Sequence, residues 1–156
     1  MGAERSVLFV CTGNTCRSPL AEALCKVRLA ERLGVSVKEL ASRGFVIRSG
    51  GVAASPGDAA SEEAVSIARE FGADLTGHRS RPVNPEWLDT ATDVIAMTGM
   101  HAFLLDRCFP GLGPPAELLC EQDDLPDPIG GDATLYRASA RIIVHHVDRL
   151  ITEWLE

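Results

Sequence analysis

The sequence has 156 residues, of which 46% are hydrophobic and 24% are charged, enough for one hydrophobic core, so we expect a single domain over residues 1–156. The formal net charge of −7 argues against a nucleic-acid partner, because such binding needs a basic face that displaces counterions from phosphates. No apolar stretch approaches the roughly 20 residues that span a bilayer, and no signal-peptide pattern follows the start, so we expect a cytoplasmic protein without a membrane partner.

The first half of the chain alternates strand-like and helix-like segments. The run SVLFV, at 6–10, is stopped by turn residues and predicts a buried strand. A helix is expected over about 18–33, because a proline suits its first turn and Gly34 its end. FVIRS, at 45–49, predicts a second strand. Over 58–71, apolar residues at spacings of four, three and four predict a helix that ends at Gly72.

The second half continues the alternation. We expect a third strand in DVIAMT (93–98), a short helix over 101–108 and a weaker fourth strand at 117–120. A last helix should run over 133–154, with Ala138, Ile142, Leu150 and Trp154 facing inward. The pattern predicts an α/β three-layer sandwich with a central four-stranded parallel sheet and helices on both faces. In such folds functional residues gather beyond the carboxyl ends of the strands, where the loop after the first strand lies.

That loop reads CTGNTCRS, at 11–18, and has the composition of an anion site. A loop that enters a helix points several N–H groups into one concavity, and the helix dipole adds partial positive charge. Gly13 permits close approach of the backbone, Asn14 tolerates a left-handed conformation, and Arg17 can grip two phosphate oxygens. The same environment stabilises a thiolate, so Cys11 is a candidate nucleophile with Ser18 as its hydrogen-bond donor.

Other readings of the loop are weaker. A zinc site lacks a second ligand pair, because Cys108 and Cys120 do not complement Cys11 and Cys16 at the usual spacing, so we expect no metal. Five scattered cysteines suit reduced thiols rather than a disulfide framework. No dinucleotide fingerprint and no Walker lysine is present, and we expect no cofactor. A buried structural cysteine beside an ordinary turn stays open, although it leaves the arginine, glycine and asparagine unexplained.

The C-x5-R-S loop resembles the phosphate-binding loop of the low-molecular-weight protein tyrosine phosphatase family. SPLAEAL directly after it, RSGGV (48–52), GHRSR (77–81), AMTGMH (96–101) and DPIGGD (127–132) occur in the family's order, and the similarity covers essentially the whole chain. The resemblance implies a flavodoxin-like fold of the phosphotyrosine phosphatase I type. It also implies a cysteine-dependent hydrolase that acts on phosphorylated proteins or peptides and releases inorganic phosphate.

The resemblance also implies roles for individual residues. Cys11 would attack phosphorus and become a phosphocysteine, and Asp127 would protonate the leaving group and later activate water. A carboxylate before proline is biased toward an extended conformation, although a solvated loop acid is the alternative for Asp127. His78 would steady Asn14, unless it is simply a structural histidine. The phosphoryl oxygens would be held by the loop residues Thr12, Gly13, Asn14, Thr15, Cys16 and Arg17.

Two further residues of the loop carry open questions. Cys16 is either a partner for a reversible disulfide with the nucleophile, as in the family, or a residue that fills space beneath the loop. Thr15 resembles the arginine-directed branch of the family, whereas tyrosine-directed members tend to have a bulkier aliphatic residue. Ile129 follows the Asp-Pro pair, where many relatives have tyrosines that flank phosphotyrosine, and Tyr136 is the chain's single tyrosine. Phosphoarginine is therefore slightly favoured over phosphotyrosine.

Three remaining readings complete the expectations. The family fold also hosts arsenate reductases, but the segment 78–96, where they carry thiols, has no cysteine. A non-catalytic anion-binding module would fit better if Cys11, Arg17 or Asp127 were missing. Residues 52–54 are small where relatives tend to have an aromatic wall, so the pocket is expected to be wide. His101, His145 and His146 carry no metal-ligand pattern and are interpreted as structural or surface residues.

Overall fold

A computed structural model describes residues 4–156, and its centre is one parallel β-sheet. The strands are β1 (Arg5–Cys11), β2 (Phe45–Gly51), β3 (Asp93–Ala96) and β4 (Glu117–Leu118), in the order β2-β1-β3-β4. All three pairings are parallel, and Cys11 lies opposite Gly51 at the carboxyl end of the β1–β2 ladder. The predicted four-stranded parallel sheet is confirmed.

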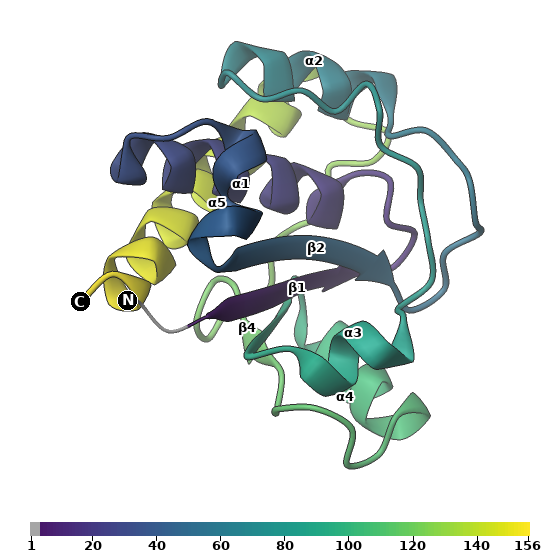
Figure 1. Cartoon of the computed structure of the whole chain (residues 1–156). Coiled ribbons are helices and arrows are strands. Elements are labelled where there is room, and N and C mark those ends of the chain that lie inside the picture. Colours follow the sequence, from purple (N-terminus) through teal and green to yellow (C-terminus); the bar gives the residue numbers. More distant parts are fainter. Residues whose placement is uncertain (1–3) are drawn as a thin grey trace.

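Helices cover both faces of the sheet (Figure 1). On one face lie α1 (Arg17–Leu33), α2 (Glu62–Glu70) and α5 (Ala133–Trp154), and on the other lie α3 (Pro85–Thr90) and α4 (Gly99–Cys108). Side chains of β1 alternate between the faces: Phe9 packs in the core under α1 and α5, and Val10 packs in a smaller core toward α3 and α4. Two 3-10 turns, Val37–Glu39 and Ala41–Arg43, lead into β2.

The chain order places a functional crevice at the end of β1. From β1 the chain crosses through α1 to β2 on one side, and then to β3 on the other side of β1. Ligands of open α/β sheets bind where the strand order reverses in this way. The loop 12–16 lies at this point and leads directly into α1. Within the described residues, no helix has the length and apolar character that crossing a membrane requires.

Several element boundaries differ from the sequence-based expectation. The helix predicted over 58–71 begins only at Glu62, because the Ser61 hydroxyl accepts the Ala64 N–H at 3.2 Å and caps the helix. The third strand ends at Ala96, and α4 begins at Gly99 rather than at 101, with Thr98 as its cap. Helix α3 was not predicted, although its start at Asn84-Pro85 is a typical helix N-terminus.

The predicted inward face of α5 was partly wrong. Ala138 and Ile142 are exposed, Leu150 is buried as expected, and Trp154 is half-buried at the edge of the core. The buried face follows spacings of four and three from a tyrosine, through Tyr136, Ala140, Ile143, Val147 and Leu150. The predicted face began at Ala138, two residues after Tyr136, and so pointed more than half a turn around the helix from the buried face. Tyr136 can belong to the core because its hydroxyl finds polar partners there.

Candidate active site

Cys11 ends the central strand and lies beside a polarised hydroxyl. Its side chain is buried, and its Sγ lies 2.9 Å from Ser18 Oγ in the first turn of α1. The amide nitrogen of Asn14 donates to the same Ser18 oxygen at 2.9 Å. Because the Ser18 oxygen accepts that bond, its own hydrogen remains available to be donated to sulfur. The predicted contact between Ser18 and Cys11 is thus present.

Asn14 is the residue that fixes the shape of the loop. It has a φ of 56°, in the left-handed region, and its side chain is fully buried. Its Nδ2 also donates to Ser49 Oγ at 2.9 Å, and its Oδ1 accepts the backbone N–H of Arg81 at 3.0 Å. His78 Nε2 donates to the backbone carbonyl of Asn14 at 2.8 Å. Burial lowers the pKa of His78. The sequence-based pairing of His78 with Asn14 is therefore found in the structure.

Arg17, at the start of α1, and Asp127, between β4 and α5, line the same cavity. The Arg17 side chain is 8% exposed, and its guanidinium donates to the Leu125 carbonyl at 3.1 Å. It also pairs with the carboxylate of Asp127 at 3.5 Å, while Asp127 itself is 46% exposed. The other Asp127 oxygen accepts the Ile129 N–H at 3.1 Å. Arg17 is thus held from behind by the loop that carries Asp127, and the carboxylate stays accessible.

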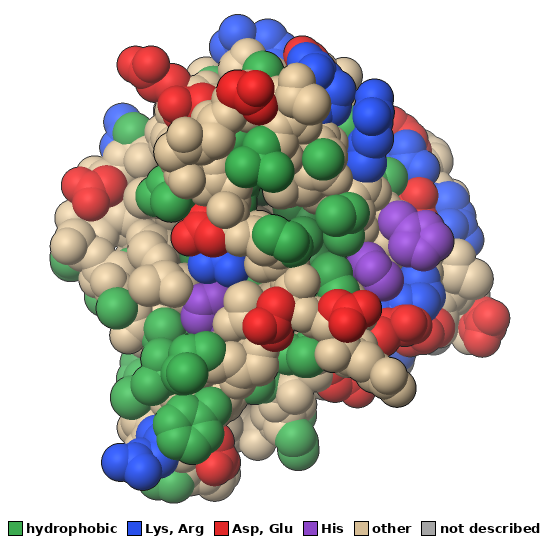
Figure 2. Space-filling view, turned by 180° about the vertical axis from the view of Figure 1, so that it is seen from behind, with side chains coloured by type: hydrophobic (Ala, Val, Ile, Leu, Met, Phe, Trp, Pro, Cys, Tyr) green, Lys and Arg blue, Asp and Glu red, His purple; other side chains and the backbone are tan. Residues whose placement is uncertain are grey.

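Together these two loops enclose a cavity of about 210 Å³. Eight residues line it, namely Cys11, Thr12, Gly13, Thr15, Cys16, Arg17, Asp127 and Ile129. Ser18, Asn14 and His78 support it from outside the lining. The space-filling view shows an acidic, a basic and a histidine side chain adjoining left of its centre (Figure 2). A cavity with a thiol, a guanidinium and an accessible carboxylate can bind an anion, attack it and exchange a proton with it.

Cys16 lies in a polar niche beneath the loop. Its Sγ is 3.4 Å from the hydroxyl of Tyr136 and 3.4 Å from that of Ser61. Burial and the contact with Cys16 raise the pKa of Tyr136 to about 12, so the phenol keeps its proton. Sequence reasoning did not foresee these partners, because Tyr136 is 120 residues away along the chain.

His101, interpreted from the sequence as a structural or surface residue, is buried beside the cavity. It is 3% exposed, and its Nε2 lies 2.8 Å from the hydroxyl oxygen of Thr12, a residue of the cavity wall. Its place in α4 follows from the cap at Thr98, whose hydroxyl accepts the His101 N–H at 3.2 Å. The signal in the sequence was the AMTGMH segment, where a threonine that can cap a helix stands three residues before the histidine.

Comparison with known proteins decides the family. The model described as "Low molecular weight phosphotyrosine protein phosphatase" matches residues 6–156. The chain belongs to this phosphatase family. It is 37% identical over 149 residues to a protein-arginine-phosphatase of Geobacillus stearothermophilus, covering 92% of each chain. It is 32% identical over 155 residues to the low-molecular-weight protein-tyrosine-phosphatase Etp of Escherichia coli, covering 96% of this chain and 91% of the relative.

The fold agrees with solved structures of the same phosphatase family. One neighbour is the YwlE arginine phosphatase, solved as a cysteine-to-serine mutant with a phosphorylated active-site serine. It superimposes with a TM-score of 0.85 at 34% sequence identity, covering 96% of this chain and 95% of that chain. The expected fold and the resemblance to the family are therefore confirmed.

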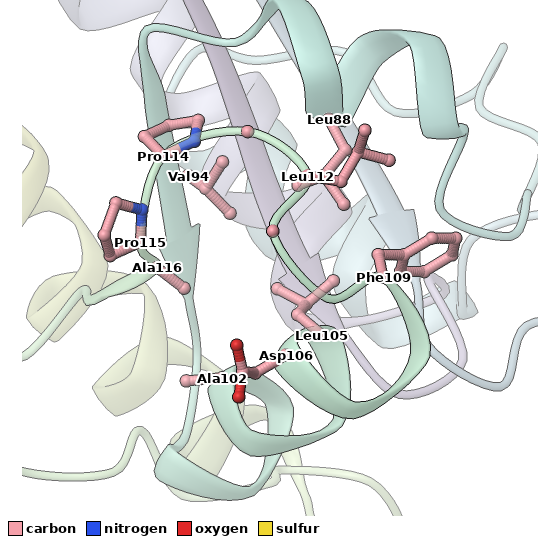
Figure 3. Close-up of a pocket in the computed structure, with 12 residues that line it drawn as sticks. Leu88, Val94, Ala102, Leu105, Asp106, Phe109, Leu112, Pro114, Pro115 and Ala116 are labelled. Atoms are coloured by element: carbon pink, nitrogen blue, oxygen red, sulfur yellow. The ribbon is translucent and has the colours of Figure 1, made fainter.

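A second cavity of this phosphatase, of about 170 Å³, lies between α3, α4 and the segment 109–116 (Figure 3). Its walls are mainly apolar, with side chains such as Leu88, Leu105 and Phe109, and Asp106 contributes one carboxylate. Among the described residues that line it there is no thiol, guanidinium or imidazole. Residues 4–156 also contain no group of three or more histidine, cysteine or acidic side chains placed to hold a metal ion. The loop cavity, which combines a thiol, a guanidinium and a carboxylate, is the candidate active site.

Proposed function

We propose that this phosphatase removes phosphoryl groups from protein side chains through a phosphocysteine, with phosphoarginine as its preferred substrate. The observation that carries the proposal is the single cavity lined by Cys11, Arg17 and Asp127. The family membership makes phosphorylated proteins or peptides the substrate class and phosphate the product.

In the first step Cys11 Sγ attacks phosphorus, a P–S bond forms, and the bond to the leaving group breaks. Arg17 and the loop N–H groups of residues 12–17 hold the equatorial oxygens while they accumulate charge. The leaving group takes a proton from Asp127. In the second step the Asp127 carboxylate removes a proton from water, which attacks phosphorus and releases phosphate and the Cys11 thiolate. The hydroxyl of Ser18 donates to sulfur in both steps.

The preference for phosphoarginine rests on two residues of the cavity wall and on the absence of an aromatic side chain from its lining. Thr15 and Ile129 line it, and Ile129 is 64% exposed at its rim. A phenol ring would need flanking aromatic side chains, but Tyr136 is 1% exposed and points at Cys16. Asp127 offers a guanidinium leaving group a carboxylate partner. Two curated relatives, 37% and 38% identical, are protein-arginine-phosphatases. Phosphotyrosine is the alternative substrate.

Two other functions are less well supported. An arsenate reductase would need additional thiols to reduce the nucleophile, and the segment 78–96 supplies none. A non-catalytic anion-binding module would not need an accessible acid in the same cavity as a thiol, yet Asp127 and Cys11 line it together.

The nucleophile is tested with Cys11→Ser and p-nitrophenyl phosphate. We expect turnover to vanish while the far-UV circular dichroism and the urea midpoint stay unchanged. Cys108→Ser, at an exposed thiol, is the matched control and should keep wild-type turnover. Activity that persists in Cys11→Ser would exclude the phosphocysteine route.

The substrate preference is tested by kcat/KM on phosphoarginine and phosphotyrosine peptides of the same sequence. Wild-type enzyme should favour phosphoarginine, and Thr15→Ile should shift the ratio toward phosphotyrosine by about tenfold or more, because added bulk fills the space beside a flat guanidinium. Thr152→Ile, at an exposed position of α5, controls for the substitution itself. An unchanged ratio in Thr15→Ile would refute the assignment of Thr15 as the specificity residue.

A further inference from the structure

A buried histidine contacts the side-chain hydroxyl of Thr12, and this hydroxyl, unlike the Thr12 backbone N–H, has no role in the steps above. His101 Nε2 lies 2.8 Å from Thr12 Oγ1, and Thr12 lines the cavity beside Cys11 and Arg17. The other ring nitrogen, Nδ1, is buried and has no hydrogen-bond partner among residues 4–156. Because only one of the two ring nitrogens has a hydrogen-bond partner, the surroundings of the ring determine which nitrogen carries its proton.

The protonation state of His101 follows from its surroundings. Burial is the main cause that lowers its pKa to about 4, and the nearby charge of Arg17 adds to it, against the opposing effect of Asp124 and Asp127. The ring is therefore neutral near pH 7 and carries one N–H. A proton on Nδ1 would be a buried donor without an acceptor, whereas a proton on Nε2 has the Thr12 oxygen as its acceptor. The proton belongs on Nε2.

This tautomer determines the direction of the hydrogen bond. Nε2–H donates, and the Thr12 oxygen accepts. The hydrogen of the Thr12 hydroxyl is then not used by His101 and is free for another acceptor. Thr12 is exposed in the cavity wall, where an oxygen of a bound phosphoryl group would be the acceptor.

We propose that Thr12 is a side-chain donor to the transferring phosphoryl group, and that His101 is the positioning residue that fixes its hydroxyl as a donor. The inference rests on the proposed phosphatase function and deepens it. The bond strengthens as negative charge accumulates on the phosphoryl oxygens, so it favours the transition state over the bound substrate. No proton is transferred: the Thr12 hydroxyl keeps its hydrogen throughout, and His101 stays neutral.

The test is a double-mutant cycle on p-nitrophenyl phosphate. Thr12→Val removes the hydroxyl at nearly constant shape, and His101→Leu removes the ring donor. We expect each to lower kcat about tenfold to a hundredfold with a smaller change in KM, and inhibition by orthovanadate to weaken by a similar factor. The double variant should be no worse than Thr12→Val alone, because His101 acts through Thr12.

Conservative variants separate positioning from structure. Thr12→Ser keeps the hydroxyl and should keep most of kcat, and His101→Gln places an amide N–H near the former Nε2 and should recover most of what His101→Leu loses. Urea midpoints are measured for all variants. If His101→Leu does not fold, Thr12→Val, Thr12→Ser and His101→Gln still carry the test. Thr134→Val, at an exposed position of α5, is the matched control.

The outcomes are distinguishable from failure of the proposed function. Wild-type turnover that Cys11→Ser abolishes supports the phosphatase, whatever Thr12 does. Wild-type kcat in Thr12→Val would overturn the inference alone. Equal losses from His101→Leu in the wild-type and Thr12→Val backgrounds would show that His101 acts by another route, which also overturns it. An absence of turnover in the wild type would refute the proposed function itself.

Discussion

Replacing His101 with glutamine should change how the stability of the fold depends on pH. In the folded protein the pKa of His101 is lowered to about 4, mainly by burial, whereas its ordinary value is 6.5. The unfolded chain therefore binds a proton below about pH 6.5 that the folded chain binds only near pH 4. Stability from this group is complete above pH 6.5 and is lost as the pH falls toward 4.

The size of the effect follows from the two pKa values. The contribution changes by about 2 kcal/mol between pH 7 and pH 5, from linkage at about 1.4 kcal/mol per pH unit. His101→Gln cannot titrate and lacks this dependence. His78 and His146, whose pKa values are also lowered by burial, are present in both proteins and cancel in the comparison.

The assay is urea unfolding followed by tryptophan fluorescence at several pH values from 7 to 5. As the pH falls from 7 to 5, the free energy of unfolding of wild type should fall by about 2 kcal/mol relative to that of His101→Gln. His145→Gln, at an exposed position, is the control and should run nearly parallel to wild type. A difference that stays constant within about 0.5 kcal/mol would show that His101 is not held neutral, and would remove the basis for its tautomer.

Three more predictions concern Asp127, Cys16 and Gly51 at the end of β2. Asp127→Ala should slow hydrolysis of poor leaving groups far more than that of p-nitrophenyl phosphate, with the exposed Asp123→Asn as control; equal losses on both would exclude the general-acid role. After peroxide treatment, thiols should restore wild-type activity but not that of Cys16→Ser, and equal recovery would exclude a protective disulfide. Gly51→Ala should lower the free energy of unfolding in urea by about 1–3 kcal/mol, because the added Cβ would meet the Thr12 carbonyl and would lie 2.7 Å from the Ala54 Cβ. Gly77→Ala is the control and should lower it little, because the added Cβ lies in open space. Comparable losses in the two variants would contradict this packing argument.

The sheet and the loop could be predicted because their signals are local. A buried strand, a glycine turn and a helix start follow one another within 6–18, so the place of Cys11 at the end of the central strand needs no tertiary information. The same holds for Ser18, which is four residues beyond Asn14 and accepts a hydrogen bond from its side chain. Asp127 is different: Asp123, Asp124 and Asp132 look alike locally, and the family resemblance was needed to select among them.

Contacts between distant segments could not be predicted. His101 and Thr12 are 89 residues apart, and only the packing of α4 beside the end of β1 brings the imidazole to the cavity wall. The inner face of α5 was missed for a related reason. A tyrosine in an amphipathic pattern is ambiguous until a partner for its hydroxyl is known, and here that partner is Cys16, in a loop that the sequence alone does not place over α5.

The niche around Cys16 bears on whether this residue acts in redox protection or only in packing. Its sulfur contacts the hydroxyls of Tyr136 and Ser61, which also lie 3.5 Å from each other, and lies 3.9 Å from that of Thr15. A serine at this position can make the same contacts, whereas an alanine removes one partner from each hydroxyl and leaves Tyr136 with Ser61, whose oxygen also accepts the Ala64 N–H. Cys16→Ser should therefore keep basal turnover and the urea midpoint while losing thiol-dependent recovery, and Cys16→Ala should lose stability as well. Both variants lack the thiol, and they differ only in the hydroxyl. The difference between their urea midpoints therefore measures the structural contacts of Cys16, and the recovery after oxidation that both lose measures its redox role.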